Sequence, residues 1–384
     1  MELDQITQQS ATELRKARRI VVKLGSSLVR EAGTGESTNR LESLVRSIVS
    51  LKSEGRQIVL VSSGAISLGS AKLGLPTVRL GDLVLRQACA AVGQSLLMHF
   101  YENLFNHHGV KIAQLLLTED DFTNRQRYSN LRRTMERLLK LGVVPIVNEN
   151  DTVSTVELES FDTSGRRVFS DNDRLSALIM SKLEAQALII LSNVDGLLLS
   201  NGEGPVIPFV TEISAELRTL ASGPSVDGRG GMVTKLQAAE IAMRAGGIAV
   251  IANGRTPDVL DQIFAGEKIG TTFLSENRIG GKRRWIKYSA NLCGKLIINP
   301  GAQKAILEKK ASLLSSGVVS VQGQFKALDV ISIVDHHGRE FARGIVNYPS
   351  HEAELMIATS PMSNSRNHSK ARVLVTRNNL VLND

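Results

Sequence analysis

The sequence predicts an α/β fold, in which a sheet carries helices on both faces, followed by a smaller module rich in β-strands. Up to about residue 255, short apolar runs alternate with longer amphipathic stretches, the pattern of strands joined by helices. From Gly294 onward, short apolar runs are separated by turns that contain glycine. The length of 384 residues also exceeds the ~150 residues of an average domain. Ligands of α/β sheets bind beyond the carboxyl ends of the strands, so chemistry is expected in the residues that follow each strand.

Strands of the first part are expected where apolar, often β-branched residues cluster. The six runs are residues 18–25 (RRIVVKLG), 57–64 (QIVLVSSG), 110–118 (VKIAQLLLT), 143–150 (VVPIVNEN), 186–196 (QALIILSNVDG) and 246–254 (GGIAVIANG). Helical periodicity marks residues 40–55 and 83–109 between them. Glycines that match the signal for a helix C-terminus are Gly55, Gly109, Gly142 and Gly246.

The second part follows a basic, turn-rich stretch. Its expected strands are residues 294–299 (GKLIIN), 317–321 (GVVSV), 329–335 (DVISIVD) and 341–348 (FARGIVNY), with one helix at 302–314 (AQKAILEKKASLL). We therefore divide the chain into five segments. They are an N-terminal extension (1–17), an α/β domain (18–278), a linker (279–293), a β-rich module (294–368) and a C-terminal tail (369–384).

Composition excludes several classes of protein. No apolar run approaches the ~20 residues of a membrane span, and the polar N-terminus lacks the layout of a signal peptide. The two cysteines, Cys89 and Cys293, are far apart, which argues against a disulfide framework or a zinc site. We expect a cytoplasmic protein, because reducing compartments favour such sparse cysteine usage.

Charge is unevenly distributed. From Lys282 to Asp384 there are 15 lysines and arginines against 7 aspartates and glutamates, so this last quarter accounts for the whole net charge of +8. A basic module indicates contact with a nucleic acid or an acidic protein, and a merely solvated basic face explains the surplus equally well.

Two of the strand ends carry a lysine or small residues. Lys23 leaves the first strand and Gly25 follows it, which suits a phosphate, because a lysine and backbone N–H groups can both contact its oxygens. After the second strand, Ser63, Gly64 and Ala65 allow the backbone to approach a ligand closely. A lysine that only caps a strand and an ordinary turn are the structural alternatives.

Acidic and amide side chains cluster at two further places. Asn148 and Asp151 end the fourth strand, and residues 171–173 (DND) open a helix. Carboxylates and amides at a strand end suit an ammonium group, although helix capping explains one residue of each cluster.

Ser192 and Asn193 follow the fifth strand, and a glycine turn precedes Lys235. The turn lacks the GxxxxGK[ST] spacing of a P-loop, yet it offers N–H donors and a cation to a phosphate. Two lysines and two glycine turns thus favour an anionic ligand, and the acid-amide clusters favour a ligand with an amine. A kinase acting on an amino acid fits both, and an ionised acceptor carboxylate needs no general base.

Five motifs in order carry a resemblance to a known family. The motifs VVKLGSSLV, VSSGAISLG, VVPIVNENDTV, SDNDRLSAL and GRGGMVTKLQAAEIAMRAG resemble the amino acid kinase family over residues 18 to about 278. The chain from Gly294 onward is similar to a PUA domain. The resemblance implies an open three-layer α/β/α sandwich followed by a PUA pseudobarrel. Kinases of acetylglutamate, aspartate, carbamate or UMP share the first fold but ordinarily lack the second.

The resemblance implies transfer of the γ-phosphoryl group of ATP, with Mg²⁺, to the side-chain carboxylate of L-glutamate. The product would be L-glutamyl 5-phosphate, the first intermediate of proline biosynthesis, and proline would be the feedback inhibitor. It also implies a homo-oligomer and allows a partnership with glutamyl phosphate reductase, while RNA binding by the PUA domain stays open.

The resemblance assigns roles residue by residue. Lys23 and Lys235 would contact the phosphates, and Asp173 would hold both lysines in place. The glutamate site would contain Ser63, Asp151 and Asn172, with Gly64, Ala65, Asn148 and Asp171 close by. The nucleotide site would contain Ser192, Asn193, Arg229, Gly230, Gly231, Met232, Val233, Thr234 and Lys235. No metal ligand is assigned.

Three positions depart from the family pattern, and they bear on nucleotide affinity and loop flexibility. Asn193 stands where an aspartate is common, Ser170 where glycine is usual, and Arg229 where a small residue is usual. The rival interpretations are a kinase of another small acid and an RNA-binding protein with a relic kinase domain. A dinucleotide-binding oxidoreductase fits less well, since no GxGxxG follows the first strand.

Overall fold

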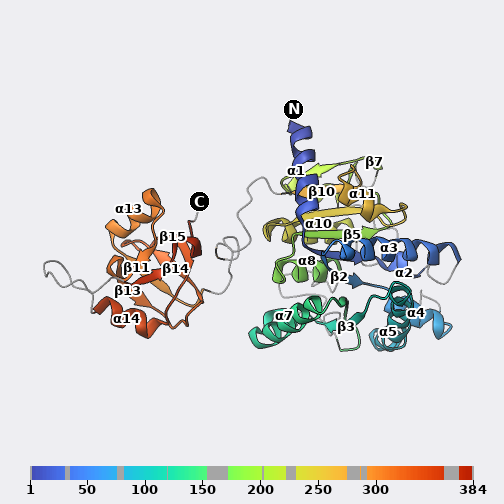
Figure 1. Cartoon of the computed structure of the whole chain (residues 1–384), viewed down its shortest axis with the longest axis horizontal. Coiled ribbons are helices and arrows are strands. Elements are labelled where there is room, and N and C mark those ends of the chain that lie inside the picture. Colours follow the sequence, from blue (N-terminus) through green and yellow to red (C-terminus); the bar gives the residue numbers. More distant parts are fainter. Residues whose placement is uncertain are drawn as a thin grey trace. The chain divides into compact units, whose positions relative to one another are not determined.

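The structure, a computed structural model, divides into two compact units, Met1–Asn277 and Arg278–Asp384. It describes residues 2–30, 35–75, 82–118, 120–153, 172–200, 203–221, 231–274, 286, 292–358 and 372–382. Figure 1 draws the first unit in blue to yellow and the second in orange to red.

The first unit is built on a sheet that contains eight strands within the described residues, in the order β3-β4-β2-β1-β5-β9-β10-β8. The strands are β1 (Arg19–Leu24), β2 (Gln57–Ser62), β3 (Ile112–Leu117), β4 (Val144–Glu149), β5 (Ala187–Ser192), β8 (Phe209–Val210), β9 (Ile248–Asn253) and β10 (Thr271–Leu274). All neighbours run parallel except β9 and β10. A short hairpin, β6 (Leu198–Ser200) and β7 (Glu203–Val206), stands apart from this sheet. The six predicted strands are confirmed.

Helices cover both faces of the sheet and enclose two separate apolar cores (Figure 1). The first face carries α1 (Glu2–Lys16), α2 (Ser26–Arg30), α3 (Gly35–Ser53), α4 (Ala65–Lys72), α5 (Leu83–Asn106) and α11 (Val259–Ala265). The second carries α6 (Asp120–Thr123), α7 (Arg125–Lys140), α8 (Asn172–Lys182), α9 (Ala215–Leu220) and α10 (Met232–Arg244). The predicted three-layer α/β/α sandwich is therefore confirmed.

The alternation of side chains along β1 decides which face receives its lysine. Ile20 and Val22 belong to the core of the first face, and Val21 belongs to the core of the second. Because successive strand residues point to opposite faces, Lys23 shares the face of Val21, where α8 and α10 pack. The strand thus delivers a lysine to the helices that carry the other charged residues.

The four glycines predicted at helix C-termini adopt the left-handed backbone that such ends require. Their φ angles are 82° at Gly55, 66° at Gly109, 73° at Gly142 and 83° at Gly246. Each of these glycines ends a helix shortly before a strand: β2, β4 and β9 start two residues after Gly55, Gly142 and Gly246, and β3 starts three residues after Gly109.

The second unit holds a β-rich sheet around a core of its own. The order within the described residues is β13-β11-β14-β15-β17. The strands are β11 (Lys295–Ile298), β13 (Val318–Gln322), β14 (Val330–Val334), β15 (Glu340–Ile345) and β17 (Leu380–Leu382), and β12 (Leu313–Leu314) pairs with β16 (Val373–Val375). The helices are α13 (Pro300–Lys309) and α14 (Ser350–Ala358), with single 3₁₀ turns at η3 (Ser315–Gly317) and η4 (Arg377–Asn379).

Two details of this unit differ from the sequence prediction. The helix expected to reach residue 314 ends at Lys309, because Lys310 takes a left-handed conformation with φ of 49° and Leu313 enters a strand. The segment expected as a tail from residue 369 supplies β16 and β17. Leu374 and Val375 are fully buried there, so the tail belongs to the module instead of trailing from it.

None of the helices among the described residues is both long enough and apolar enough to cross a lipid bilayer.

Candidate active site

A buried carboxylate on the second face of the sheet holds two lysines. Asp173 Oδ1 lies 2.5 Å from Lys23 Nζ, and Asp173 Oδ2 lies 3.2 Å from Lys235 Nζ. Asp173 is completely buried, and the two lysines are 4% and 5% exposed. Burial alone would raise the pKa of the Asp173 carboxyl, but the ammonium groups of Lys23 and Lys235 hold it below its usual value. Three ionised groups with a net charge of +1 therefore sit together.

Three elements bring this triad together. Lys23 comes from β1, Asp173 from the first turn of α8, and Lys235 from the first turn of α10. Thr234 donates its hydroxyl to Asp173 Oδ2 at 3.1 Å, and the same hydroxyl lies 2.9 Å from the carbonyl oxygen of Gly231. Thr234, expected in the nucleotide site, thus holds the carboxylate that pairs the lysines.

The end of β5 lies beside the triad in the sheet. In the parallel register Lys23 faces Ile190, and the N–H of Gly25 donates to the carbonyl of Leu191 at 2.9 Å. Ser192 is 4% exposed, and its buried Oγ has no hydrogen-bond partner among the residues described. Asn193, by contrast, is exposed. This strand end therefore offers one buried hydroxyl and one accessible amide beside the end of β1.

A cluster of neutral polar side chains adjoins the triad through the chain itself. Asn172 immediately precedes Asp173, and its Nδ2 donates to Ser63 Oγ at 2.9 Å and to Asn148 Oδ1 at 3.1 Å. Asn148 is 2% exposed. Ser63, Asn148 and Asn172 come from three segments far apart in the sequence, and all three were predicted to lie in one binding site. The structure brings them together.

The segment after Ser63 depends on a close crossing of two helices. Gly64 has a φ of 116°, and Ala65 begins α4. A Cβ on Gly69 of α4 would lie 1.8 Å from the carbonyl oxygen of Cys89, and one on Gly93 of α5 would lie 1.8 Å from that of Ala65. Only glycine at both positions allows this approach. It sets α5 against the start of α4.

Asp151 lies three residues beyond Asn148 and is half-buried. Burial raises the pKa of Asp151 to about 7, with the charge of Glu149 adding to the rise and that of Arg86 opposing it. A carboxyl that titrates near neutrality attracts a cationic ligand only when it has lost its proton. The hydrogen bonds described above do not join Asp151 to Asn172, so the place of Asp151 in the same site is an expectation.

Sequence reasoning missed two residues, Gln94 and Arg86, which both lie on α5. Gln94 Oε1 accepts a hydrogen bond from Asn148 Nδ2 at 2.8 Å, and Arg86 interacts electrostatically with Asp151. The available signal was the run of small residues at 88–93 (ACAAVG), which indicates a helix face that packs closely on another element.

The remaining expected residues divide into two groups. Gly231, Met232 and Val233 form the start of α10, with Val233 39% exposed. Outside the described residues lie Asp171, Ser170, Arg229 and Gly230.

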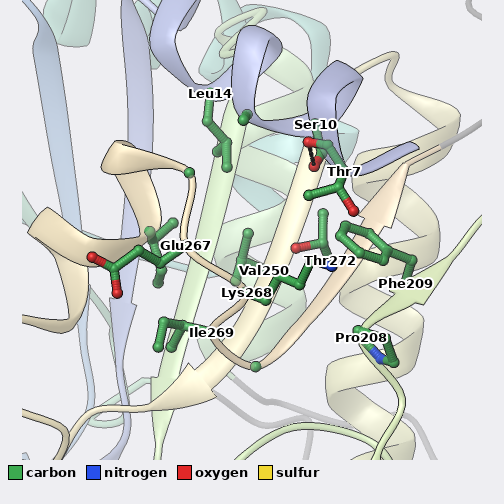
Figure 2. Close-up of a pocket in the computed structure, with 14 residues that line it drawn as sticks. Thr7, Ser10, Leu14, Pro208, Phe209, Val250, Glu267, Lys268, Ile269 and Thr272 are labelled. Atoms are coloured by element: carbon green, nitrogen blue, oxygen red, sulfur yellow. Dashed lines mark hydrogen bonds between the residues drawn. The ribbon is translucent and has the colours of Figure 1, made fainter. Parts of the chain in front are cut away.

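A separate hollow lies between α1 and the strands β8 to β10 (Figure 2). Its lining includes Thr7, Ser10, Phe209, Lys268 and Thr272, all of which Figure 2 labels. It contains none of the site residues predicted from the sequence.

Comparison with known proteins agrees with the resemblance seen in the motifs. The model of the amino acid kinase family matches residues 18–252, and the PUA domain model matches residues 294–360. A glutamate 5-kinase from Caldanaerobacter subterraneus subsp. tengcongensis is 45% identical over 342 residues, which cover 88% of this chain and 89% of that protein. A glutamate 5-kinase from Methylococcus capsulatus is 39% identical over 385 residues, which cover 97% of this chain and 100% of that protein. The chain therefore belongs to the amino acid kinase family, as a kinase domain followed by a PUA domain.

Proposed function

We propose that this kinase transfers the γ-phosphoryl group of ATP to the side-chain carboxylate of L-glutamate and forms L-glutamyl 5-phosphate and ADP. The observation that carries the proposal is that Asn172 and Asp173 are consecutive. Asn172 belongs to the neutral polar cluster and Asp173 to the lysine triad, so one turn of α8 joins a site suited to an amino acid to a site suited to phosphates. The relatives named above supply the identity of the amino acid.

The triad suits the chemistry of the transfer. One oxygen of the substrate carboxylate forms a bond to the γ-phosphorus while the bond from that phosphorus to the oxygen of the β-phosphate breaks. No proton moves, because the acceptor is already ionised at neutral pH. Lys23 and Lys235 offset the negative charge of the transferring group, and Asp173 keeps both ammonium groups in position.

The polar cluster suits the amino acid end of the substrate. Ser63, Asn148 and Asn172 offer hydrogen bonds, and ionised Asp151 offers a negative charge to the α-ammonium group. We assign Gly64 and Ala65, which follow Ser63 directly, to the same end of the substrate. We assign Ser192, Asn193 and the start of α10 from Gly231 to the nucleotide.

Mg²⁺ fits the site as an ion that binds together with the phosphates of the nucleotide. No group of three or more metal-binding side chains occurs among the described residues, and both oxygens of Asp173 face lysines. Mg²⁺ commonly binds phosphate oxygens and water instead of a cage of protein ligands. When bound in that way, it would neutralise charge on the phosphates.

Trapping with hydroxylamine tests the proposal. The purified protein with ATP and Mg²⁺ is given L-glutamate, N-acetylglutamate, aspartate or UMP, and hydroxylamine converts any acyl phosphate to a hydroxamate. We expect hydroxamate with L-glutamate in excess of the other carboxylic acids. A larger yield of hydroxamate with N-acetylglutamate or aspartate would show that this other acid is the substrate. Phosphorylation of UMP would show that the acceptor is a phosphate group and not a carboxylate.

Four finer expectations stay predictions. Proline is expected to compete at or near the glutamate site, so adding it to the trapping assay should raise the apparent KM for glutamate. The active form is expected to be a homo-oligomer. Glutamyl phosphate reductase is the natural partner, because an acyl phosphate hydrolyses readily. A cytoplasmic location follows from the composition.

RNA binding is the second candidate, and the basic surplus from Lys282 onward favours it. Binding driven by phosphate contacts would weaken steeply as salt is added. Tight, salt-sensitive binding of RNA by a protein that gives no hydroxamate would replace the kinase assignment. Such binding together with hydroxamate would give the protein both activities.

A further inference from the structure

A chain of hydrogen bonds leads from α5 to the proposed glutamate site. Gln94 Oε1 accepts from Asn148 Nδ2 at 2.8 Å. Asn148 Oδ1 accepts from the N–H of Glu149 at 2.9 Å and from Asn172 Nδ2 at 3.1 Å. Asn172 Nδ2 also donates to Ser63 Oγ at 2.9 Å. Four side chains from four segments are thus linked: Asn172 donates to Ser63 on one side and to Asn148 on the other, and Asn148 donates to Gln94.

The direction of the chain follows from the chemistry of the amide group. An amide has an acceptor oxygen and a donor nitrogen on opposite sides, so a flip exchanges the two. If Asn148 were flipped, its nitrogen would face the N–H of Glu149 and its oxygen would face Gln94 Oε1. The contact with the N–H of Glu149 would then be repulsive, and this backbone donor cannot turn away. The Glu149 N–H therefore fixes which atom of Asn148 faces it, and Gln94 holds the Asn148 amide from the other side by accepting from its nitrogen.

The orientation of Asn148 decides that of Asn172. Because Asn148 presents its oxygen, Asn172 must present its nitrogen, and the oxygen of Asn172 must face elsewhere. That Oδ1 atom is buried and has no hydrogen-bond partner among the described residues. A buried acceptor without a partner costs stability, which a ligand that donates a hydrogen bond would restore.

Ser63 receives the opposite polarity from the same chain. Its Oγ accepts from Asn172, so its own proton can be donated to another group. The two ends of the cluster therefore offer an acceptor at Asn172 and a donor at Ser63. This pair suits an amino acid, because its α-ammonium group donates hydrogen bonds and its α-carboxylate accepts them.

We propose that Gln94 is a positioning residue for the amino acid substrate: it holds Asn148, so that Asn172 presents an acceptor to the α-ammonium group and Ser63 presents a donor to the α-carboxylate. This inference rests on the proposed function, since it concerns the binding of glutamate. Gln94 stands next to Gly93, whose lack of a side chain brings α5 against the start of α4. The crossing of α4 and α5 thereby fixes the position from which Gln94 acts.

Substitutions at Gln94 test the proposal. Gln94→Met keeps the length of the side chain and removes the acceptor, Gln94→Glu keeps an acceptor, and Gln126→Met is the matched control on the exposed surface of α7. For Gln94→Met we expect the KM for L-glutamate to rise about tenfold, the loss of one hydrogen bond of about 1.4 kcal/mol. The kcat and the KM for ATP should stay within about threefold of the wild type, because the triad is untouched. Gln94→Glu should recover most of the affinity for glutamate.

Three results would overturn the proposal. The first is an unchanged KM for glutamate in Gln94→Met. The second is a fall in kcat and a rise in the KM for ATP of that variant that are as large as the rise in its KM for glutamate. The third is a KM for glutamate in Gln94→Glu that is as high as in Gln94→Met. Thermal unfolding checks each variant, and Gln94→Ala, which adds no bulk to the helix crossing, replaces Gln94→Met if that variant does not fold. Failure of the proposed function is a separate outcome, since the wild type would then form no hydroxamate with glutamate.

Discussion

Asp173 shows how one residue can set the charge of a site. A buried carboxylate without partners would become protonated, and two buried ammonium groups without a counter-ion would lose protons. Here Lys23 and Lys235 keep Asp173 ionised, and the pKa of Asp173 stays below its usual value. The excess positive charge that remains is available to a phosphate. Burying these charges costs desolvation free energy, and we attribute the retention of the triad to its function and not to a gain in stability.

Removal of either lysine from this triad tests its catalytic role. For Lys23→Ala and Lys235→Ala we expect a fall in kcat of about 10²-fold or more, as when other electrostatic stabilisers are removed. Lys140→Ala, at an exposed lysine at the end of α7, should leave kcat unchanged and serves as the control. Steady-state assays with saturating ATP and glutamate give the values. Near-normal turnover in both site variants would place the phosphates elsewhere.

Asp151 should make the binding of glutamate depend on pH. Its pKa is about 7, so a proton occupies the carboxyl below that pH and competes with the α-ammonium group. The kcat/KM for glutamate should therefore rise about tenfold between pH 6 and pH 8, since each pH unit below the pKa reduces the ionised fraction about tenfold. In Asp151→Asn this part of the pH profile should disappear.

The same variant gives a second measurement at pH 8. A charge-assisted hydrogen bond contributes about 1.5–3 kcal/mol, so the KM for glutamate in Asp151→Asn should rise about tenfold or more. The KM for ATP is the internal control and should not change. Unaltered glutamate kinetics would remove Asp151 from the substrate site.

At the residue scale, the sequence predicted the site where the strand ends contain charged or polar side chains. Lys23 and Asn148 were predicted because parallel strands bring their carboxyl ends to one edge of the sheet, and Asn172 was predicted because it belongs to an acid-amide cluster that opens a helix. Gln94 was not found, because it lies in the middle of a helix whose periodicity explains it as a partly exposed position. Its partner Asn148 is 54 residues away, and no local pattern encodes such a pair.

The crossing of α4 and α5 is the element on which the polar cluster depends, and Gly93→Ala should disturb it. The added Cβ would lie 1.8 Å from the carbonyl oxygen of Ala65, a backbone atom that cannot rotate away. We expect the free energy of unfolding to fall by about 1–3 kcal/mol, the usual cost of overpacking. Separation of the helices should also raise the KM for glutamate, because Gln94 would move with α5.

Gly301→Ala is the matched control for this helix glycine. Gly301 lies in the first turn of α13, and the nearest atom to an added Cβ, Asn299 Oδ1, is 3.4 Å away. Alanine favours helices over glycine by up to about 1 kcal/mol, so this variant should be neutral or slightly more stable. Chemical denaturation of both variants gives the comparison. Equal stability of Gly93→Ala and the wild type would show that the crossing can relax.

At the element scale, prediction succeeded where the elements are long and apolar. The strands of the first unit consist of runs in which nearly every residue is buried, as in β5. Such runs are almost continuously apolar in the sequence, so they predict buried strands clearly. The strands β16 and β17 have three residues each, and their pairing partners lie some 40 to 60 residues earlier in the chain. Three residues carry too little periodicity to distinguish a strand from a polar tail.

For the whole molecule, the two compact units have separate apolar cores. Residues from β1, α3 and α5 build one core of the first unit, and residues from β11, β14 and α13 build the core of the second. Every described residue assigned above to glutamate or to phosphates lies in the unit Met1–Asn277. The residues of the proposed active site thus lie in the first unit, and the excess of basic residues lies in the second. Truncation of the chain between the units can therefore test the two roles separately.

A fragment of residues 1–277 should fold and form hydroxamate without the second unit. Because its cores are its own, we expect cooperative unfolding, with kcat and the KM for glutamate within about threefold of the full chain. Lys23→Ala in the fragment should again remove most of the activity, which shows that the same triad acts in both. Binding of RNA, if the full chain shows it, should be lost with the basic unit. A fragment that folds but makes no hydroxamate would mean that the kinase activity requires the second unit, and the assignment of the whole active site to the first unit would be wrong.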